Sequence, residues 1–201
     1  MSDTYAYLSY GNLYINLTNR CCCDCAFCIR GGGEYFGKHK LWLSREPDAN
    51  QVIEAIEKHD KTSYNEVVFC GYGESTYRMD CLVEVARAVK DRLDKRIRLN
   101  TNGLGKLING YDIVPKLKGV VDSVSISLNQ CTASKYQALV RSIYGEESFG
   151  VLIDFARSTK AAGIDTQMSV VAVIPSEDIA GCRRICDELG VRLRVRGNEL
   201  L

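Results

Sequence analysis

Hydrophobic and polar positions along the chain follow two alternating periods, which indicates a regular succession of helices and strands. Apolar residues at three- and four-residue intervals predict amphipathic helices, and short apolar runs predict buried strands. The predicted strands cover residues 12–18, 66–71, 97–103, 122–129, 166–174 and 191–197. The predicted helices cover residues 50–60, 81–94, 149–163 and 177–190, with shorter helical pieces near 111–119 and 132–140.

Six strands separated by helices are typical of βαβ units with parallel strands. The second to fifth strands contain VVF, IRL, VSI and VVAVI, which are apolar on both faces as a covered parallel sheet requires. No Pro/Ser-rich linker divides the chain, so we expect one α/β domain over residues 1–201. An open doubly wound sheet and a partly closed barrel both fit this pattern. In either fold, active groups are expected at the carboxyl ends of the strands.

A long segment without predicted structure, residues 19 to about 47, separates the first strand from the first helix. Five of the ten cysteines lie within its residues 21–28, and a loop of this length is usually functional. Cys21, Cys25 and Cys28 have the spacing C-x3-C-x2-C. Because adjacent cysteine side chains diverge, no more than one of the three consecutive cysteines 21–23 is expected to be a ligand in this set. Three thiolates can hold three corners of a cubane iron–sulfur cluster and leave the fourth iron open to an exogenous ligand.

Structural zinc is the alternative metal for this loop, because zinc also binds C-x2-C pairs. It would need a second pair of ligands at similar spacing downstream. The chain offers only Cys182 and Cys186 for that purpose, and their spacing suits two small packed residues on a helix equally well.

Composition narrows the setting in which this loop works. The chain has 26 basic and 25 acidic residues, so no single-sign charge indicates a nucleic-acid or membrane partner. No signal-peptide pattern or membrane-spanning apolar run is present in the sequence. We therefore expect a cytoplasmic protein, in which clustered cysteines stay reduced and indicate metal binding or catalysis before disulfides.

Glycines and a carboxylate follow the second strand, and short polar side chains follow the third and fourth. Gly71, Gly73 and Glu74 stand in CGYGEST, where glycine lets the backbone approach a ligand and a carboxylate suits an ammonium group. An ordinary turn is the alternative for this stretch and for LNTNG, which contains Asn100 and Asn102. In SISLN, Ser125, Ser127 and Asn129 alternate and project to one face, which indicates a wet interior.

The C-x3-C-x2-C spacing, with Phe27 before its last cysteine and its place after the first strand, resembles the radical S-adenosylmethionine (radical SAM) superfamily. The resemblance extends from about residue 10 to residue 197 and implies a partial (β/α)6 barrel of parallel strands. It implies that Cys21, Cys25 and Cys28 hold a 4Fe–4S cluster whose open iron is chelated by S-adenosylmethionine (SAM). Reductive cleavage of SAM would then give a 5′-deoxyadenosyl radical that abstracts hydrogen from an unidentified substrate.

The same resemblance implies the SAM contacts. CGYGE resembles the superfamily's GGE motif, which binds the amino group of SAM, although Tyr72 replaces a glycine and Ser75 stands where proline is common. The side chains after the third and fourth strands would contact the ribose and the carboxylate, and an apolar wall near Val173 would hold the adenine. The implied SAM-binding residues are Gly71, Gly73, Glu74, Asn100, Asn102, Ser127, Asn129 and Val173.

Within the superfamily, the combined text NLTNRCC-DC-FCIR, VVFCGYGE, IRLNTNG and SISLN resembles the small proteins named for association with TatD-type hydrolases. That resemblance implies a functional link to such a hydrolase but supplies no substrate. The chemistry also implies a low-potential electron donor, flavodoxin or ferredoxin, and an oxygen-sensitive protein.

Two other functions remain open from the sequence: an activase that installs a glycyl radical on a partner protein, and an iron–sulfur carrier or sensor without chemistry of its own. Cys131 is a candidate hydrogen-atom donor, or else an incidental buried thiol. Arg194 and Arg196 alternate with Arg192 on the last strand. They would hold a carboxylate or phosphate of the substrate if that face is internal, or protect an edge strand if it faces water.

Overall fold

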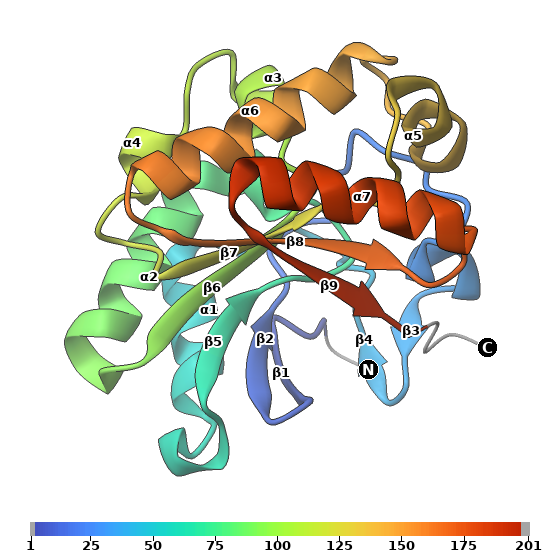
Figure 1. The fold of residues 1–201 in the computed structure, drawn as a ribbon. Coiled ribbons are helices and arrows are strands. Elements are labelled where there is room, and N and C mark those ends of the chain that lie inside the picture. Colours follow the sequence, from blue (N-terminus) through green and yellow to red (C-terminus); the bar gives the residue numbers. More distant parts are fainter. Residues whose placement is uncertain (1–2, 198–201) are drawn as a thin grey trace. The chain divides into compact units, whose positions relative to one another are not determined.

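All six predicted strands occur in the computed structural model, which describes residues 3–197 (Figure 1). They are β2 (Asn12–Ile15), β5 (Glu66–Phe69), β6 (Arg96–Thr101), β7 (Ser123–Ser127), β8 (Asp165–Val171) and β9 (Arg192–Arg196). The predicted helices are α1 (Ala49–Glu57), α2 (Met79–Leu93), α5 (Ala133–Val140), α6 (Glu147–Ala161) and α7 (Ser176–Leu189). The alternation of strands and helices is the predicted α/β pattern.

Several short elements were not predicted. The strand β1 (Ala6–Ser9) pairs antiparallel with β2 through a two-residue turn in which Tyr10 and Gly11 both have positive φ. A small hairpin of β3 (Tyr35–Phe36) and β4 (His39–Lys40) lies in the loop that carries the cysteines. The helix α3 (Gly105–Asn109) is additional, and α4 (Val114–Leu117) is shorter than the helical piece predicted near 111–119.

The chain divides into two compact units, each assembled from separate stretches of sequence. The first contains the described residues up to Cys21 with Ile29–Asn100 and Lys116–Asp122, and the second contains Cys22–Cys28, Thr101–Pro115 and the described residues from Ser123 onward. The expected single domain over residues 1–201 stays a prediction.

In the first unit, β2 pairs parallel with β5, and β5 pairs parallel with β6. Leu13, Val67 and Ile97 on these strands are completely buried, which accounts for their continuous apolar sequence. The helix α1 starts at a capping box, in which Asp48 accepts from the Gln51 backbone and the Gln51 side chain accepts from the Asp48 backbone.

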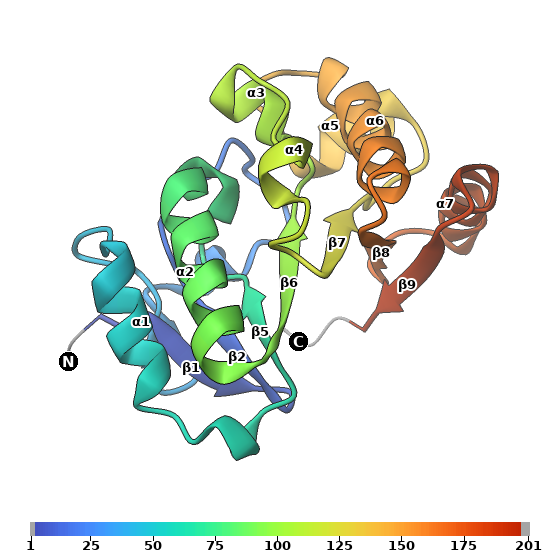
Figure 2. The same cartoon turned by 90° about the vertical axis from the view of Figure 1, so that its left-hand side faces the viewer.

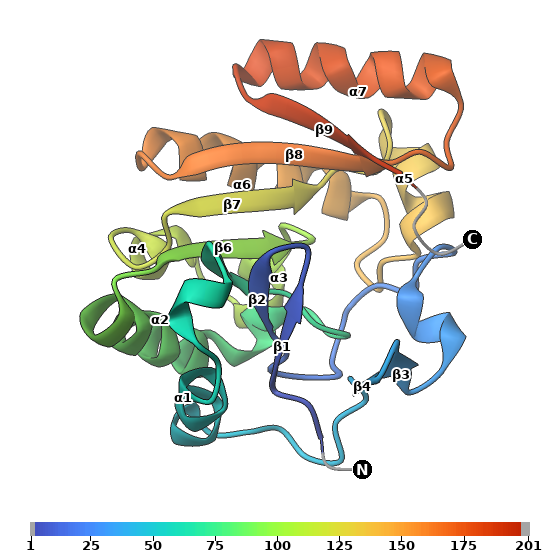
Figure 3. The same cartoon turned by 90° about the horizontal axis from the view of Figure 1, so that it is seen from below.

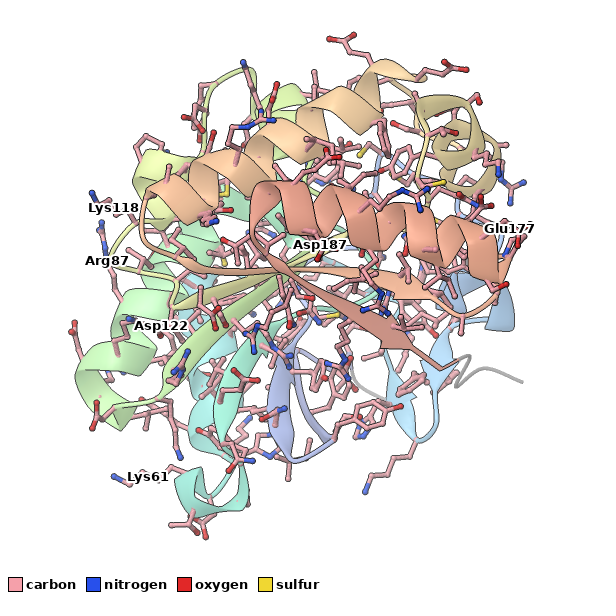
Figure 4. The ribbon with its side chains drawn as sticks, in the orientation of Figure 1. Lys61, Arg87, Lys118, Asp122, Glu177 and Asp187 are labelled. Carbon is pink, nitrogen blue, oxygen red and sulfur yellow. The ribbon has the colours of Figure 1, made fainter. Side chains whose placement is uncertain are left out.

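Asp122, labelled in Figure 4, is the last residue of the segment Lys116–Asp122 and connects it to other parts of the first unit. Its carboxylate accepts a hydrogen bond of 2.7 Å from the backbone N–H of Ile97 and pairs with the Lys90 ammonium at 2.6 Å. The turn that leads to β7 is thereby tied to β6 and α2.

In the second unit, β7, β8 and β9 form a parallel sheet and point in one direction in Figure 3. The helices α6 and α7 lie on one side of these strands in Figure 2. A hydrogen bond of 3.0 Å from the Thr166 hydroxyl to the Thr159 hydroxyl joins β8 to α6. Thr166, Met168 and Val170 therefore form the helix-covered face of the sheet, and the alternating residues face the other side.

No helix within residues 3–197 is both long enough and apolar enough to cross a bilayer.

Candidate functional site

The five cysteines of the segment 21–28 fall into two sets. Cys21, Cys25 and Cys28, hereafter the motif cysteines, are half-buried. Cys22 and Cys23, hereafter the inner cysteines, are 1% and 5% exposed. All ten cysteines of the chain are free of disulfides, so the donor chemistry that an iron–sulfur cluster needs is present in the motif set.

The inner cysteines belong to the packing of the second unit. The Asn102 side-chain amide donates to the Cys22 sulfur at 3.3 Å and to the Cys23 sulfur at 3.7 Å, and the two sulfurs lie 3.9 Å apart. The backbone N–H of Ile143 donates to the Cys22 carbonyl at 2.9 Å, and Cys23 forms a β-bridge with Ser142. These contacts hold both thiols inside the unit.

The segment around Cys25 is anchored to the end of α5. The backbone N–H groups of Asp24 and Ala26 donate to the carbonyls of Val140 and Leu139 at 3.1 and 3.0 Å. The N–H of Cys28 donates to the Cys25 carbonyl at 3.1 Å, which forms a tight turn between these two motif cysteines. The backbone is therefore fixed where their side chains are half-buried.

In the first unit, the GYGE stretch packs against the chain that leads to Cys21. A Cβ on Gly73 would lie 2.3 Å from the Thr18 carbonyl oxygen and 2.6 Å from that of Arg20, so only glycine fits. The N–H of Glu74 donates to the Arg20 carbonyl at 2.8 Å. A Cβ on Gly71 would similarly lie 2.1 Å from the Asn16 side-chain oxygen. Both predicted glycines thus provide close backbone approach, here between two parts of the protein.

The Glu74 side chain is buried and turns back on its own loop. Its carboxylate accepts from the Thr76 backbone at 3.1 Å and from the Thr76 hydroxyl at 2.8 Å. A carboxylate has room for further hydrogen bonds besides these. The role of Glu74 toward the amino group of SAM stays a prediction.

Glu46 fixes the same approach to Cys21 from the far end of the loop. It accepts a hydrogen bond from the Thr18 hydroxyl and forms ion pairs with Arg20 at 2.7 Å and Arg78 at 3.0 Å. Burial opposes ionisation of this carboxyl, but the Thr18 and Arg20 hydrogen bonds and the charges of Arg20 and Arg78 hold its pKa below the usual value. Sequence reasoning missed Glu46, because its partners lie up to 32 residues away.

Two predicted SAM-binding residues carry a buried amide oxygen without a partner among the described residues. These atoms are Oδ1 of Asn100, at the end of β6 in the first unit, and Oδ1 of Asn129, after β7 in the second unit. Asn129 is 3% exposed and has a φ of 57°, a conformation that asparagine tolerates better than most residues. Leaving a buried acceptor unpaired costs about 1–3 kcal/mol, so each oxygen suits a hydroxyl or amine donor from a ligand.

Asn102 and Val173 have less distinctive surroundings. Besides the two thiol contacts, the Asn102 oxygen accepts from the Leu104 backbone at 2.9 Å and starts the turn into α3. Val173 follows β8 and is 42% exposed. Their roles toward SAM stay predictions.

Cys131 lies against α7 in the second unit. Its sulfur donates to Asp178 at 3.4 Å, and a Cβ on Gly181 would lie 2.7 Å from the Cys131 Cβ. Asp178 also accepts from Gln130 at 3.1 Å and pairs with Lys135. Burial and the neighbouring Asp178 carboxylate raise the pKa of the Cys131 thiol, while the Lys135 hydrogen bond lowers the pKa of Asp178. Both shifts favour a protonated Cys131 thiol beside an ionised Asp178 carboxylate. Asp178 lies in the first turn of α7, next to Glu177, which Figure 4 labels.

Cys182 and Cys186, the only downstream pair offered for zinc, are buried on α7. Burial, with the nearby Cys131 and Cys186 for Cys182, raises the pKa of Cys182 to about 12 and that of Cys186 to about 11. Such thiols stay neutral and pack as small apolar groups, whereas zinc requires thiolates.

No three histidine, cysteine or acidic side chains within residues 3–197 already lie in a metal-binding arrangement. The assignment of cluster ligands therefore depends on the C-x3-C-x2-C spacing and on the half-buried state of the motif thiols.

Comparison with known families gives one match over most of the chain. The model of the radical SAM superfamily matches residues 15–189, from the last residue of β2 to the end of α7. No curated protein matches the chain.

Solved structures with similar folds include several radical SAM proteins. SuiB of Streptococcus suis, solved with S-adenosylmethionine and with the precursor peptide SuiA, aligns with a TM-score of 0.71 at 18% identity. A radical SAM methyltransferase of Sphaerobacter thermophilus aligns at 0.60 and 14% identity over 96% of this chain and 68% of its own. The protein anSMEcpe, solved with bound AdoMet, aligns at 0.62 and 13% identity over 92% of this chain and 50% of its own.

The SuiB alignments cover 92–94% of this chain but only 39–40% of SuiB, so the chain spans about two fifths of that protein. These similarities confirm the predicted fold class, an α/β fold with mostly parallel strands of the kind found in partial radical SAM barrels. Members of the superfamily use a 4Fe–4S cluster and SAM. The chain belongs to the radical SAM superfamily.

Proposed function

We propose that this protein is a radical SAM enzyme in which Cys21, Cys25 and Cys28 hold the 4Fe–4S cluster. The observation that carries the proposal is the different burial of the five thiols: the three with the superfamily spacing are half-buried, and the other two are 1% and 5% exposed. When bound and reduced, such a cluster supplies the electron that cleaves SAM and begins hydrogen abstraction from substrate.

The protein's own residues would bind and orient SAM. Gly73 lets the backbone before Cys21 pass close to the GYGE loop, and Glu74 has carboxylate capacity for the amino group of SAM. The unpaired oxygens of Asn100 and Asn129 suit the ribose hydroxyls as donors. We assign the remaining predicted contacts to Gly71, Asn102, Ser127 and Val173.

An external electron donor of low potential, flavodoxin or ferredoxin, completes this function. Membership of the TatD-associated subgroup, a link to a TatD-type hydrolase and a cytoplasmic setting also stay predictions. Both a small molecule and a protein or peptide fit as substrate, and SuiB was solved with a precursor peptide.

The test is anaerobic reconstitution with iron and sulfide, followed by electron paramagnetic resonance of the reduced protein with and without SAM. We expect about four iron atoms per chain and a cluster spectrum that changes when SAM is added. A spectrum indifferent to SAM would overturn the proposal and leave the carrier or sensor alternative. Bound zinc without iron would leave a structural metal loop.

The activase alternative shares the SAM-dependent spectrum and differs in its product. It predicts a persistent glycyl radical on a partner protein, detectable by the same spectroscopy after the two proteins are mixed. A hydrogen-abstracting enzyme with a small substrate would leave no such protein radical.

A further inference from the structure

The parallel sheet of the second unit aligns polar residues in rows across its strands. Ser127 on β7 is in register with Ser169 on β8, which is in register with Arg194 on β9. Residues in register on parallel strands project to the same side of the sheet. The row Ser127–Ser169–Arg194, hereafter the oxyanion row, therefore shares one face of the sheet, from the last residue of β7 to the middle of β9.

This face is opposite the one that packs against the helices. Thr166, which contacts α6 through Thr159, alternates with Gln167 and Ser169 on β8. Met168 and Val170 on the helix side are apolar and completely buried. The other side carries a glutamine, serines that are themselves buried on β8 (Ser169, 2% exposed), and all three arginines of β9. Figure 2 shows the same arrangement, with α6 and α7 together on one side of β7, β8 and β9.

The arginines of this face differ in their partners. Arg192, toward the amino end of β9, pairs with Asp165 on β8 at 3.3 Å. Arg194 is exposed and forms no ion pair or side-chain hydrogen bond within residues 3–197. If the arginines only protected an edge strand, Arg192 and Arg194 would not need different partners. A guanidinium that binds an external anion, in contrast, must not already be paired with a carboxylate of the protein.

We propose that Arg194, with the hydroxyl group of the neighbouring Ser169, binds an oxyanion of the substrate, either a carboxylate or a phosphate. A guanidinium offers a planar pair of donors that matches these groups, and serine hydroxyls supply further donors. Strands in a sheet are spaced by about 4.8 Å, so the backbones of Ser127 and Arg194 lie about 10 Å apart. An oxyanion bound at Arg194 would thus lie in the same row as Ser127, which is assigned above to SAM.

The substrate class is therefore anionic. This inference rests on the proposed function, because the bound oxyanion belongs to a substrate only if the protein is an enzyme. The oxyanion site itself is measurable without SAM or reductant.

The test is isothermal titration calorimetry of the reconstituted protein at low ionic strength, with inorganic pyrophosphate and with succinate as separate probes. We expect at least one probe to bind, and the preferred probe distinguishes a phosphate from a carboxylate. Arg194→Met should weaken binding about tenfold or more, the usual effect of losing a hydrogen bond to a charged group. Arg194→Lys, which keeps the charge but loses the paired donors, should fall between Arg194→Met and the unmodified protein.

Arg192→Met is the matched control, since it removes a similar charge from the same face two residues away. It should bind the preferred probe within about threefold of the unmodified protein, because Asp165 already neutralises Arg192. The inference is wrong if neither probe binds, or if both methionine variants lose affinity equally. It is also wrong if Arg194→Met weakens SAM binding as much as probe binding, since Arg194 would then serve the cofactor. Failure of the proposed function would appear separately, as a cluster that does not respond to SAM.

Discussion

The motif cysteines and the inner cysteines are neighbours in sequence and differ in what surrounds their thiols. The Cys22 and Cys23 sulfurs are enclosed, lie 3.9 Å apart and accept from Asn102. Cys21, Cys25 and Cys28 remain half-buried. In the second unit the backbone around Cys25 is hydrogen-bonded to the end of α5, and in the first unit the backbone before Cys21 is hydrogen-bonded to the GYGE loop. The thiol group is thus enclosed by the protein in one set and partly exposed in the other.

This difference teaches that local cysteine density does not indicate how many thiols bind metal. An inner thiol already has an amide donor and a close-packed site, so moving it toward a cluster would leave a cavity and an unpaired amide. The predictions below are arranged by expected effect, and each tests whether the two sets are as distinct as the structure indicates.

The largest effect is expected from Cys25→Ala. Loss of a direct cluster ligand should weaken cluster binding by more than about 100-fold, beyond the 10–100-fold typical of residues that only support a ligand. Iron and sulfide content after anaerobic reconstitution measures this. If Cys25→Ala retained a full cluster, the distinction between the two sets would be wrong.

Gly73→Ala should disturb the approach to the motif cysteines without removing a thiol. The added Cβ would lie 2.3 Å from the Thr18 carbonyl oxygen, so the backbone before Cys21 must move. We expect a loss of about 3 kcal/mol in the free energy of unfolding, measured by urea denaturation. The control is Gly31→Ala, because a Cβ there meets nothing within 4 Å and its effect should stay within about 0.5 kcal/mol. Equal stability of the two variants would contradict the close packing of the GYGE loop.

Cys22→Ala, unlike Cys25→Ala, should affect the stability of the fold and not the iron content. The buried sulfur is lost, which should lower the free energy of unfolding by about 1–2 kcal/mol, while iron content stays at the level of the unmodified protein. Urea denaturation and iron analysis of the same preparation give both quantities. Loss of the cluster in this variant, with the fold intact by circular dichroism, would place Cys22 among the ligands.

The smallest effect concerns pH and Glu46. Because the pKa of Glu46 is lower in the folded protein than in the unfolded chain, its contribution to stability is present above about pH 4.3. It is lost as pH falls through the lower folded-state pKa. Glu46→Gln should therefore reduce stability at pH 7 and flatten the loss of stability below about pH 4.3, measured by thermal unfolding across pH. The exposed Glu34→Gln is the control, and an identical acid profile in the two variants would contradict the role of Glu46.

Much of the fold could be predicted because its signals are local. Apolar runs such as VVF and VSI and the periodic faces of α2 and α7 give strands and helices within a few residues of their observed ends. The β1–β2 hairpin was missed although Tyr10-Gly11 is a turn signal, since a four-residue strand gives little periodicity. The helix α3 was missed because its start depends on a contact from the Asn102 side chain to the Leu104 backbone.

The site was predictable only where residue type and spacing carry the chemistry. The C-x3-C-x2-C spacing and the glycines of CGYGE are readable in the sequence, and the structure adds a physical reason for Gly71 and Gly73. Glu46, the enclosure of the inner cysteines and the different partners of Arg192 and Arg194 depend on residues distant in sequence. Such relations appear only when the chain is folded.

The most direct test of the account is the product of SAM cleavage. Reconstituted protein is reduced anaerobically with dithionite in the presence of SAM, and 5′-deoxyadenosine is measured by mass spectrometry for the unmodified chain, Cys22→Ala and Cys25→Ala. The account predicts product from the unmodified chain and from Cys22→Ala, and none above background from Cys25→Ala. The account would be contradicted if the unmodified protein, with its full cluster, formed no 5′-deoxyadenosine. It would also be contradicted if the Cys25→Ala variant were as active as Cys22→Ala.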